Sequence, residues 1–540
     1  MIPGLPPLKV IETITLGGDA ATTKIPASGT IADLMPSGSR HVVVLVNGRS
    51  SAGSGARDNF QLQFNEDTGA NYHTQYFAGY GSTVAGGRDS LTYGLMQGAA
   101  DGSPTNAMSG GAMLIPHAFN TSNYKSALVM GGADEDIVQT AVLAWANTAA
   151  ITDVTVGSLA GDLVAGTVIK LCVVDETYLV SGGEQLLGSD GALAVDSIPE
   201  GNENLTVIGY LRGAAATTGV NLNLLFNDDT TLTNYHSQYI QAFGTSAAAA
   251  TVNSARIGAA IADSGTASVF CPSLSTVNRH ADGVNDPHVL SLSGYWQSSS
   301  DSGIRPSSMR RNNVEAITKV ELQADVPGST TFLSGSGMWV YSVPKVLLER
   351  KTLGSDTASV TFTLSGLSIP DSVKDLRINV YGRSTQTAAS DATDISINSD
   401  TTATNYDHQF IYGSSTTVAA AQSAGDVYAG SVSGANGTAN VFSGGSMLFP
   451  NYASTDRTQH ILFMYGTDAG QQMGINSVRW ENTAAIATIN LTPRNGSWVA
   501  GSVIELEGIA GALGWTGTVS GVANPQAVNA VDKANIEKVM

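Results

Sequence analysis

The chain of 540 residues is long enough for about three or four domains, and charged residues make up only 13% of it. Lys and Arg number 26 and Asp and Glu number 45, which gives a net charge of −19. A chain of this charge repels phosphate backbones and anionic lipids, so nucleic acid and membrane surfaces are excluded as expected partners. Hydrophobic residues still reach 42%, which is enough to form several buried cores.

The N-terminal residues Met1 to Pro7 lack the basic and apolar stretches of a signal peptide. The apolar runs are also far shorter than the ~20 residues of a membrane helix. Two cysteines in the whole chain exclude a disulfide framework and a Cys-based zinc site. The sequence therefore predicts a protein that is made in a cytosol and is stabilised by packing alone.

Four sequence markers recur three times in the same order, with a period of roughly 165 to 170 residues, which is a normal domain size. The first is an apolar strand that leads into Arg49, Arg212 and Arg383. The second is an Asn-x-Asp-Thr loop that leads into Asn-Tyr and then into Gln75, Gln238 and Gln409. The third ends at Pro116, Pro272 and Pro450, and the fourth begins at Asn147, Asn313 and Asn482. The chain therefore contains three copies of one module.

Apolar and polar residues alternate within each copy, as at Phe60, Leu62 and Phe64, which is typical of strands with one buried and one wet face. Clusters of Gly, Asn, Asp and Ser separate these segments. The pattern predicts an all-β chain of three tandem antiparallel β-sandwich modules of jelly-roll type. The expected boundaries are 8–180, 181–346 for the divergent middle copy, and 347–510. A Gly-rich linker and a short helix or frayed tail are expected over 511–540, and the third module is predicted to fold alone as a monomer.

The acidic loops are the first candidates for chemistry, because Asp67, Asp229 and Asp400 recur in all three copies. They lack the fixed Gly and the terminal Glu of an EF-hand loop. Asn and Asp side chains also bond to their own backbone in turns. We interpret the loops as structural turns, with a metal site as the weaker alternative.

Histidine and cysteine do not form a recurring catalytic arrangement. His73 and His236 share one position and His408 lies one residue later, but no acid–base partner recurs with them, so we interpret them as surface or loop residues. Cys271 aligns with Ile115 and Phe449, which predicts a small core residue. Cys172 aligns with Glu507, which predicts partial exposure.

Other catalytic signatures are also missing from the sequence. No pair of carboxylates recurs beside a tryptophan, as a glycosidase would require. The chain has no phosphate-binding loop, dinucleotide fingerprint or nucleophile elbow. Trp145 and Trp480 correspond to Arg311 in the middle copy, and we interpret both tryptophans as core residues. The sequence therefore predicts no catalytic residue, no cofactor and no metal.

The segment from Trp480 to Ile509 resembles a segment found in many structural proteins of tailed bacteriophages. An Asn482-Thr-Ala-Ala-Ile run precedes a Gly-containing turn and a closing strand that begins Ala500-Gly-Ser. The copy from Trp145 to Leu171 fits nearly as well, and the middle copy departs at Arg311. The resemblance covers most of residues 8–510. It implies a virion surface protein, either a head decoration, a head fibre or a tail fibre, and it implies no catalytic or binding residue.

These observations favour a non-enzymatic structural protein of a tailed-phage virion that assembles in the host cytoplasm. Within that class they favour an accessory or decoration protein on the capsid exterior, because the long heptads or β-helical repeats of many fibre shafts are missing. The alternative is a tail-fibre or adhesin component that binds host-surface carbohydrate. Such binding needs exposed aromatic residues, for which the candidates are Tyr76, Phe77, Tyr80, Tyr239 and Phe243. A polysaccharide-degrading enzyme is the third class.

The expected partners are other capsid or tail proteins, with a host glycan and a homo-oligomer left open. One basic cluster is unusual in this acidic chain, namely Arg305, Arg310 and Arg311 of the middle copy. Arg is favoured where carboxylates are contacted away from water. These arginines either pair with the chain's own acids or dock on an acidic neighbour, which would be a sister module or the particle shell. They are the candidate partner-contact residues.

Overall fold

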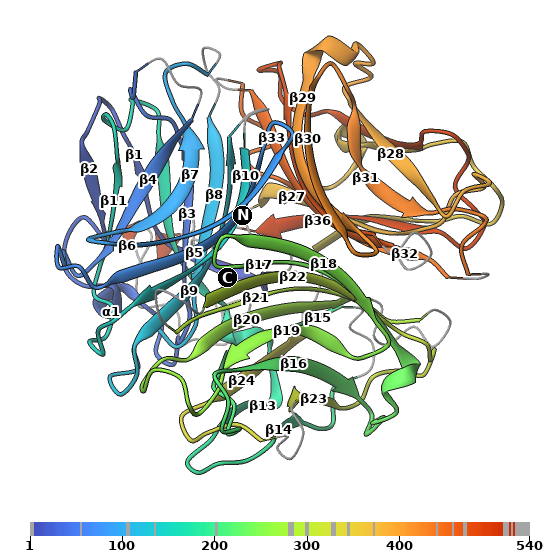
Figure 1. Ribbon diagram of the computed structural model, residues 1–540. Helices are drawn as coiled ribbons and strands as arrows, with labels where there is room; N and C mark the ends of the chain where they lie inside the picture. The colour runs from blue at the N-terminus through green and yellow to red at the C-terminus, as the bar shows by residue number, and fades with distance from the viewer. Residues whose placement is uncertain are drawn as a thin grey trace.

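Almost all regular structure in the chain is β-strand (Figure 1). The computed structural model describes residues 5–53, 57–103, 108–133, 137–199, 204–278, 286–297, 302–325, 331–342, 346–370, 373–438, 441–455, 458–467, 472–510, 518–519 and 522–523. The long strands form three pairs of antiparallel sheets, and each pair contains one eight-stranded and one four-stranded sheet. The predicted fold of three tandem β-sandwich modules is confirmed.

The first module contains β1 (Leu8–Thr15), β2 (Thr22–Ile25), α1 (Ile31–Leu34), β3 (Val42–Gly48), β4 (Arg57–Phe64), β5 (Tyr72–Tyr80), β6 (Thr83–Leu91), β7 (Gly94–Ala99), β8 (Ser109–Ile115), β9 (Lys125–Ala133), β10 (Ile137–Trp145), β11 (Val154–Ser158) and β12 (Val168–Val174). The second contains β13 (Leu179–Leu186), β14 (Leu193–Val195), β15 (Asn204–Leu211), β16 (Gly219–Phe226), β17 (Tyr235–Phe243), β18 (Ser246–Val252), β19 (Arg256–Ile261), β20 (Cys271–Asn278), β21 (His288–Trp296), β22 (Ser302–Arg311), β23 (Val320–Asp325) and β24 (Gly337–Ser342). The third contains β25 (Val346–Thr352), β26 (Val360–Thr363), β27 (Val373–Gly382), β28 (Ser390–Ile397), β29 (Tyr406–Ser414), β30 (Thr417–Ala424), β31 (Tyr428–Ser433), β32 (Ser443–Phe449), β33 (Gln459–Thr467), β34 (Gln472–Trp480), β35 (Thr488–Pro493) and β36 (Val503–Ala510).

Short elements connect or follow these strands. Four 3-10 helices are described, η1 (Glu176–Tyr178), η2 (Leu232–Asn234), η3 (Leu364–Gly366) and η4 (Ala403–Asn405). After Ala510 the description is limited to the pair β37 (Thr518–Val519) and β38 (Val522–Ala523). The expected helix near the C-terminus lies outside the described residues. The three sheet pairs themselves begin at Leu8, Leu179 and Val346.

Each module has the strand order of a jelly roll with two inserted hairpins. In the first module the large sheet runs β1-β12-β3-β8-β9-β10-β5-β6 and the small sheet runs β2-β11-β4-β7. Without the hairpins β5–β6 and β9–β10, the remaining eight strands pair as a double-sheet jelly roll. The second and third modules repeat this order strand for strand. Both inserted hairpins widen the large sheet on the same side.

The two kinds of sheet differ in burial. Along β4 and β28, buried and half-buried residues alternate, as predicted for strands with one wet face. Along β10 and β33, by contrast, every residue is buried. The expectation of one wet face is therefore correct for small-sheet strands such as β4, β23, β28 and β35, and wrong for the central strands of the large sheets and for β7, β19 and β31. The physical reason is that protein covers both faces of each large sheet.

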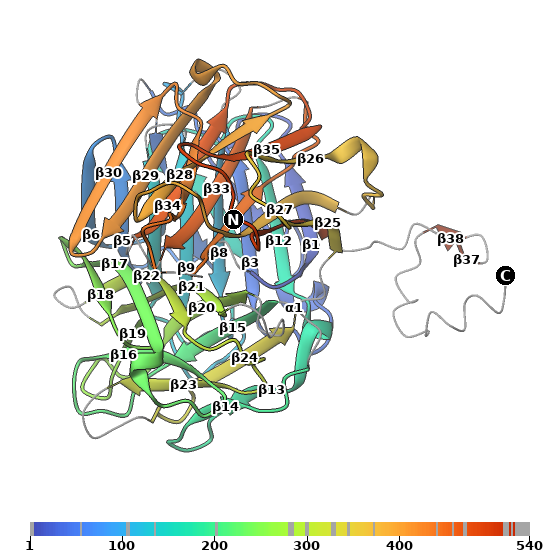
Figure 2. The ribbon, with the colours of Figure 1, turned by 90° about the vertical axis from the view of Figure 1, so that its right-hand side faces the viewer.

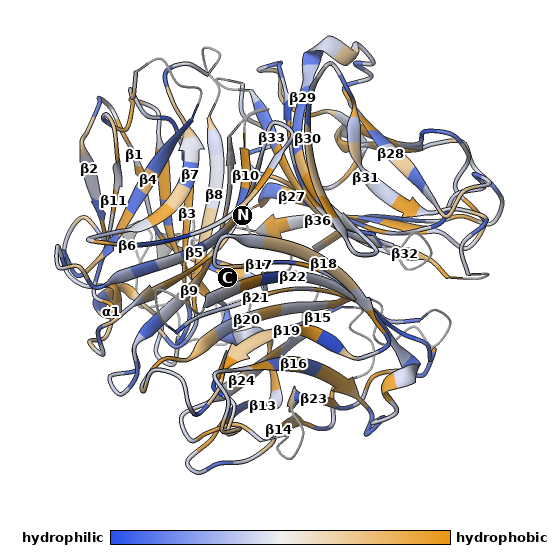
Figure 3. Cartoon of the chain, in the orientation of Figure 1, coloured by the Kyte–Doolittle hydropathy of each residue, from blue (hydrophilic) through white to orange (hydrophobic). Residues whose placement is uncertain are grey.

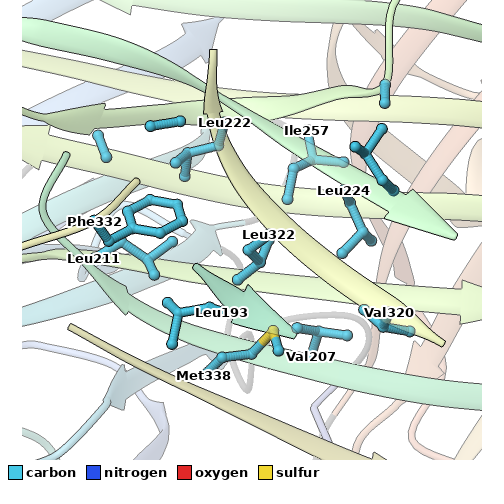
Figure 4. Packing of buried hydrophobic residues seen from close by; sticks show 14 of the residues in the cluster. Leu193, Val207, Leu211, Leu222, Leu224, Ile257, Val320, Leu322, Phe332 and Met338 are labelled. Atoms are coloured by element: carbon cyan, nitrogen blue, oxygen red, sulfur yellow. The ribbon is translucent and has the colours of Figure 1, made fainter. Parts of the chain in front are cut away.

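One face of each large sheet closes the core of its own sandwich. These cores are separate clusters that include Trp145 in the first module, Met338 in the second and Trp498 in the third. Figure 4 shows the second core, where Val207 and Leu211 of β15 lie opposite Leu222 of β16 and Leu322 of β23. Hydrophobic positions accordingly recur along the strands in Figure 3.

The other face of each large sheet points toward the centre of the molecule. The three modules lie around this centre as three lobes in Figure 1, and the hairpins β5–β6, β17–β18 and β29–β30 gather at the left-hand edge of Figure 2. A fourth hydrophobic cluster, here called the central core, includes Leu114, Phe77, Met130, Ile208, Ile240, Trp339, Ile411, Met464 and Ile475. Because it draws on all three modules, the modules share a core in addition to their own.

Candidate functional site

The recurring Asn-x-Asp-Thr loops form the same tight turn in every module. Asn65 and Glu66 both have φ of 54°, and the equivalent residues at 227–228 and 398–399 also have positive φ. Two successive left-handed residues are the geometry of a type I′ turn, which Asn and Asp tolerate well. The loops reverse the chain between a small-sheet strand and a large-sheet strand of the same module.

The shared aspartate of each loop binds the side chain that lies two residues before the fourth marker. Trp145 Nε1 donates to Asp67 Oδ2 at 2.8 Å, and Trp480 Nε1 donates to Asp400 Oδ2 at 2.9 Å. In the middle module the guanidinium of Arg311 replaces the indole, with Nε 3.6 Å from Asp229 Oδ2. Hydrogen bonding, first of all from Trp480, lowers the pKa of Asp400 to about 2.

The loop asparagine ties the second marker to the fourth. Asn65 Nδ2 donates to the carbonyl of Ala150 at 2.8 Å, and its Oδ1 accepts from the amide of Thr152 at 2.7 Å. Asn227 and Asn398 make the equivalent pairs of bonds in the other modules. The second and fourth sequence markers, which are far apart in the chain, are therefore bonded to each other in every module by this pair of hydrogen bonds, here called the clamp. This contact supports the interpretation of both markers as structural.

Removal of divalent cations is expected to leave the melting temperature unchanged. The Asp67 carboxylate already accepts bonds from Gly69, Asn71 and Trp145. Among the described residues, no group of three or more His, Cys, Asp or Glu could hold a metal ion. Calorimetric scans with EDTA and with added calcium provide the measurement. A loss of several degrees in EDTA that calcium restores would contradict the structural interpretation.

The arginine of the first marker fastens a loop of its own module. The Arg383 guanidinium donates to four backbone carbonyls, those of Ala435, Gly437, Thr438 and Val441. Arg212 does the same with the carbonyls of residues 263, 265, 266 and 269. Arg383 is only 6% exposed, and this burial lowers its pKa while leaving it a cation.

Replacement of Arg383 by Ala is expected to lower the free energy of unfolding by about 3 kcal/mol, because four carbonyls lose a charged donor and one of them, that of Val441, is buried. Arg494→Ala is the matched control. Its guanidinium pairs with Asp394 and Asp426 near the surface, and such exposed pairs contribute at most ~1 kcal/mol. Urea unfolding of both variants makes the comparison. If both variants lose the same free energy of unfolding, the carbonyl contacts of Arg383 stabilise the protein no more than an exposed ion pair does.

The structure buries all three arginines that the sequence singled out as candidate partner contacts. Arg305, Arg310 and Arg311 are 5%, 5% and 1% exposed. Arg305 donates to Gln241, Asn221 and the carbonyl of Gly258, and its guanidinium lies 4.5 Å from the centre of the Tyr239 ring.

The other two arginines pair with acids of their own module. Arg310 lies 2.6 Å from Asp286, and Arg311 contacts Asp229 and Glu315. The interpretation that these arginines pair with the chain's own acids therefore describes Arg310 and Arg311, whereas Arg305 bonds to uncharged groups of its own module.

The three histidines lie on strands and not in loops. His73 of β5 is half-buried and stacks on Trp296 of the second module, with ring centroids 3.7 Å apart. His236 of β17 is half-buried, and His408 of β29 is 1% exposed. The interpretation as surface or loop residues is wrong for His408. For His73 it misses a contact between modules.

Both cysteines are fully buried, and burial raises the pKa of each thiol. The expected partial exposure of Cys172 is wrong, because it belongs to the central core. Cys271 is a core residue as predicted, but the alignment behind that prediction is wrong. Strand pairing places Val277, not Cys271, at the position of Ile115 and Phe449.

The aromatic residues proposed for carbohydrate binding do not form an exposed platform. Phe77 is fully buried in the central core, and Tyr239 is 6% exposed beneath Arg305. Tyr76, Tyr80 and Phe243 are half-buried. The large hydrophobic residues that are exposed in the described chain are all aliphatic, namely Leu34, Leu159, Leu186, Leu232, Val314 and Leu347. The sequence-based expectation of exposed aromatic pairs is therefore wrong for these residues.

The recurring glutamines join the modules in a cycle. Gln75 Nε2 donates to the carbonyl of Gly244 at 3.0 Å, from the first module to the second. Gln238 donates to Ser415 at 3.3 Å, from the second to the third, and Gln409 donates to Gly81 at 3.2 Å, from the third back to the first. The three acceptor residues, Gly81, Gly244 and Ser415, occupy equivalent positions in three different hairpin turns, and their φ angles lie between 52° and 56°. This cycle defines a pseudo-threefold axis.

Close packing accompanies the glutamine cycle. A Cβ on Gly79 would lie 2.4 Å from Ile411 Cγ1 of the third module, and a Cβ on Gly413 would lie 2.3 Å from Ile240 Cγ2 of the second. The third contact in the cycle brings Ala242 against Gly86. Repetition of the glutamines was visible in the sequence, but repetition alone could not show that each one contacts the next module.

Two small cavities lie between modules in the described part of the chain. A cavity of about 30 Å³ lies between the first and third modules and includes Lys170 and Asp375 in its lining. A second, of about 20 Å³, lies between the second and third modules and includes His288 and Arg310. Ligand pockets measure roughly 300–1,000 Å³, whereas these volumes suit about one water each. The junctions are therefore contact surfaces.

No known family profile matches the chain, and no curated protein matches it. Solved structures match only remotely. Immune modulator A of Aeromonas veronii is 10% identical over 54% of this chain and 97% of its own, with a TM-score of 0.13. A triple jelly roll protein from the turret of an archaeal virus is 9% identical over 84% of this chain and 83% of its own, with a TM-score of 0.10. TM-scores this low carry no argument about function. Separately, the described part of the chain holds no helix with the length and hydrophobicity to cross a bilayer.

Proposed function

We propose that this chain is a non-enzymatic structural protein of a tailed-phage virion, where it acts as an accessory or decoration protein on the capsid exterior. The observation that carries the proposal is the cycle of Gln75, Gln238 and Gln409, which links each jelly roll to the next. Such an arrangement suits a passive building block, because the central strands of its large sheets are buried on both faces.

The recurring polar residues support the same proposal. Asp67, Asp229 and Asp400 hold turns and neighbouring side chains, and Arg212 and Arg383 hold loops. The polar side chains that could have been catalytic or ligand-binding thus form hydrogen bonds that stabilise the fold. The phage-like segment from Trp480 to Ile509 belongs to the same architecture, because Trp480 bonds to the loop aspartate Asp400 and Ala485 is a partner in the clamp of the third module.

Copy number per particle tests this proposal. Purified particles of the virus that encodes the chain are analysed by quantitative mass spectrometry, with the major shell protein as internal standard. Hundreds of copies per particle are expected for a decoration protein. A dozen copies or fewer would instead identify a tail or vertex fibre, and absence from washed particles would contradict a virion role altogether.

A further inference from the structure

Three equivalent hairpins meet at one end of the molecule, here called the hairpin end and defined by residues 81–83, 244–248 and 415–417, which are the turns and the first residues of the strands that follow them. Figure 1 looks onto this end, and Figure 2 shows it at the left-hand edge. The strands β6, β18 and β30 that leave these turns contact one another around the pseudo-threefold axis. Each turn also accepts the glutamine bond of a neighbouring module, so the three turns are held at fixed positions relative to one another.

The hairpin end is uncharged where it is exposed. Its exposed residues are Ser82, Thr83, Thr245, Ser246, Ala247, Ala248, Ser415, Thr416 and Thr417. Among the described residues of these hairpins, Arg88 and Asp89 are half-buried on β6, and the Arg88 guanidinium lies against Gly244 of the second turn. The exposed residues of the three turns therefore offer only small side chains and backbone groups to a partner. Depletion of charge marks the centre of a protein–protein interface.

The symmetry of this surface restricts what can cover it. Three equivalent turns around one axis offer three equivalent contacts, which only a partner with three equivalent surfaces can satisfy together. A partner of twofold or fivefold symmetry would engage one or two turns and leave the others unpaired. The fixed spacing of the turns favours a rigid threefold site over a flexible ligand, because no ordering cost is paid on binding.

Building on the proposed function, we propose that the hairpin end docks where three copies of a shell protein meet on the particle, with one turn on each copy. The contact is expected to consist of backbone groups and small uncharged side chains on both sides. Because the three turns differ in sequence, the site accommodates either exact or local threefold symmetry.

Charges placed on the hairpin end test the docking. The variant Thr83→Glu/Ser246→Glu/Thr416→Glu adds one carboxylate to each turn at an exposed position. Its control, Thr15→Glu/Ser189→Glu/Ser355→Glu, adds the same charge at exposed positions outside the hairpins. Both variants are expected to keep the melting temperature of the parent. Copies per particle are expected to fall by about tenfold or more in the turn variant alone, since its carboxylates must be desolvated on docking. Parental occupancy of the turn variant would overturn the inference.

Cryo-electron microscopy of the parent particle separates this inference from the proposed function. Three-lobed density over a threefold or local threefold position, with the hairpin end inward, is the expected result. Density over a capsomer centre, or with the hairpin end outward, would overturn the docking site and leave the decoration role intact. Density confined to the tail would overturn the decoration role. Sedimentation of the free chain covers a further case, because a dimer that the turn variant abolishes would show that a second copy occupies this end.

Discussion

A fragment of residues 347–510 is expected to associate or to remain partly folded, and not to form the stable monomer that its repeat markers suggest. In the full chain, Ile411, Met464 and Ile475 of this module are at most 4% exposed because they belong to the central core. Isolation would expose this apolar face to water, at a cost of roughly 25 cal/mol per Å². Large exposed apolar patches drive self-association in soluble proteins.

Far-ultraviolet circular dichroism and sedimentation equilibrium of the fragment provide the measurement, with the full chain as the reference. Ile411→Asp in the fragment is a useful companion, because a charge on the inward face should weaken association without touching the sandwich core. A monomeric fragment with a sharp melting transition would contradict this expectation. It would show that the sandwich folds stably without the central core, which would then only hold folded modules together.

Mild acid is expected to destabilise the protein between about pH 6.5 and pH 4.5 through histidines buried at the module junctions. The ring of His288 lies against Gly444 of the third module, and that of His460 lies against Gly110 of the first. Burial, reinforced by the cross-strand cations Arg310 and Arg479, lowers the pKa of each histidine to about 3.

The direction of this effect follows from proton binding. Above pH 6.5 both histidines are neutral in the folded and unfolded chains and have no effect. Below it, only the unfolded chain takes up the protons, so each histidine removes up to ~1.4 kcal/mol of the free energy of unfolding per pH unit. The low pKa of Asp400 acts only below about pH 4, outside this window.

Urea unfolding at several pH values measures the slope. The variant His288→Gln/His460→Gln replaces both imidazoles with amides that cannot be protonated, and its stability should depend less on pH. His41 and His117 keep a residual slope, because burial lowers the pKa of each of them too. A variant whose slope equals that of the parent would assign the acid sensitivity to other groups.

The sequence was informative wherever a pattern is local or repeated. Alternation at Phe60, Leu62 and Phe64 identified a small-sheet strand, since one wet face leaves a period of two. The repeated Asn-x-Asp-Thr loops were recognised as turns, since Asn and Asp bond their own backbone. Three copies of such patterns were enough to predict three sandwiches.

What the sequence could not show is which residues meet across modules. Strands buried on both faces lose the alternating pattern, as β10 and β33 do, so the central core left no periodic signal. Cys271 was placed by matching the prolines Pro116 and Pro272, yet the paired strands put those prolines in different positions. Arg305 and Arg311 stood out as charges, but only the fold reveals that partners within the chain surround them.

Covalent linkage gives the three-lobed arrangement a property that three separate subunits would lack. Linked modules meet at an effective concentration that dilution of the protein cannot lower. Assembly of the three modules therefore does not depend on how much protein the cell makes. Linkage also frees each third of the molecule to drift in sequence on its own. Arg311 illustrates such a difference, since the middle copy has a guanidinium where the other two have the indole of Trp145 or Trp480, and the aspartate is present in all three. Three modules in one chain can thus differ from one another while their ratio stays fixed.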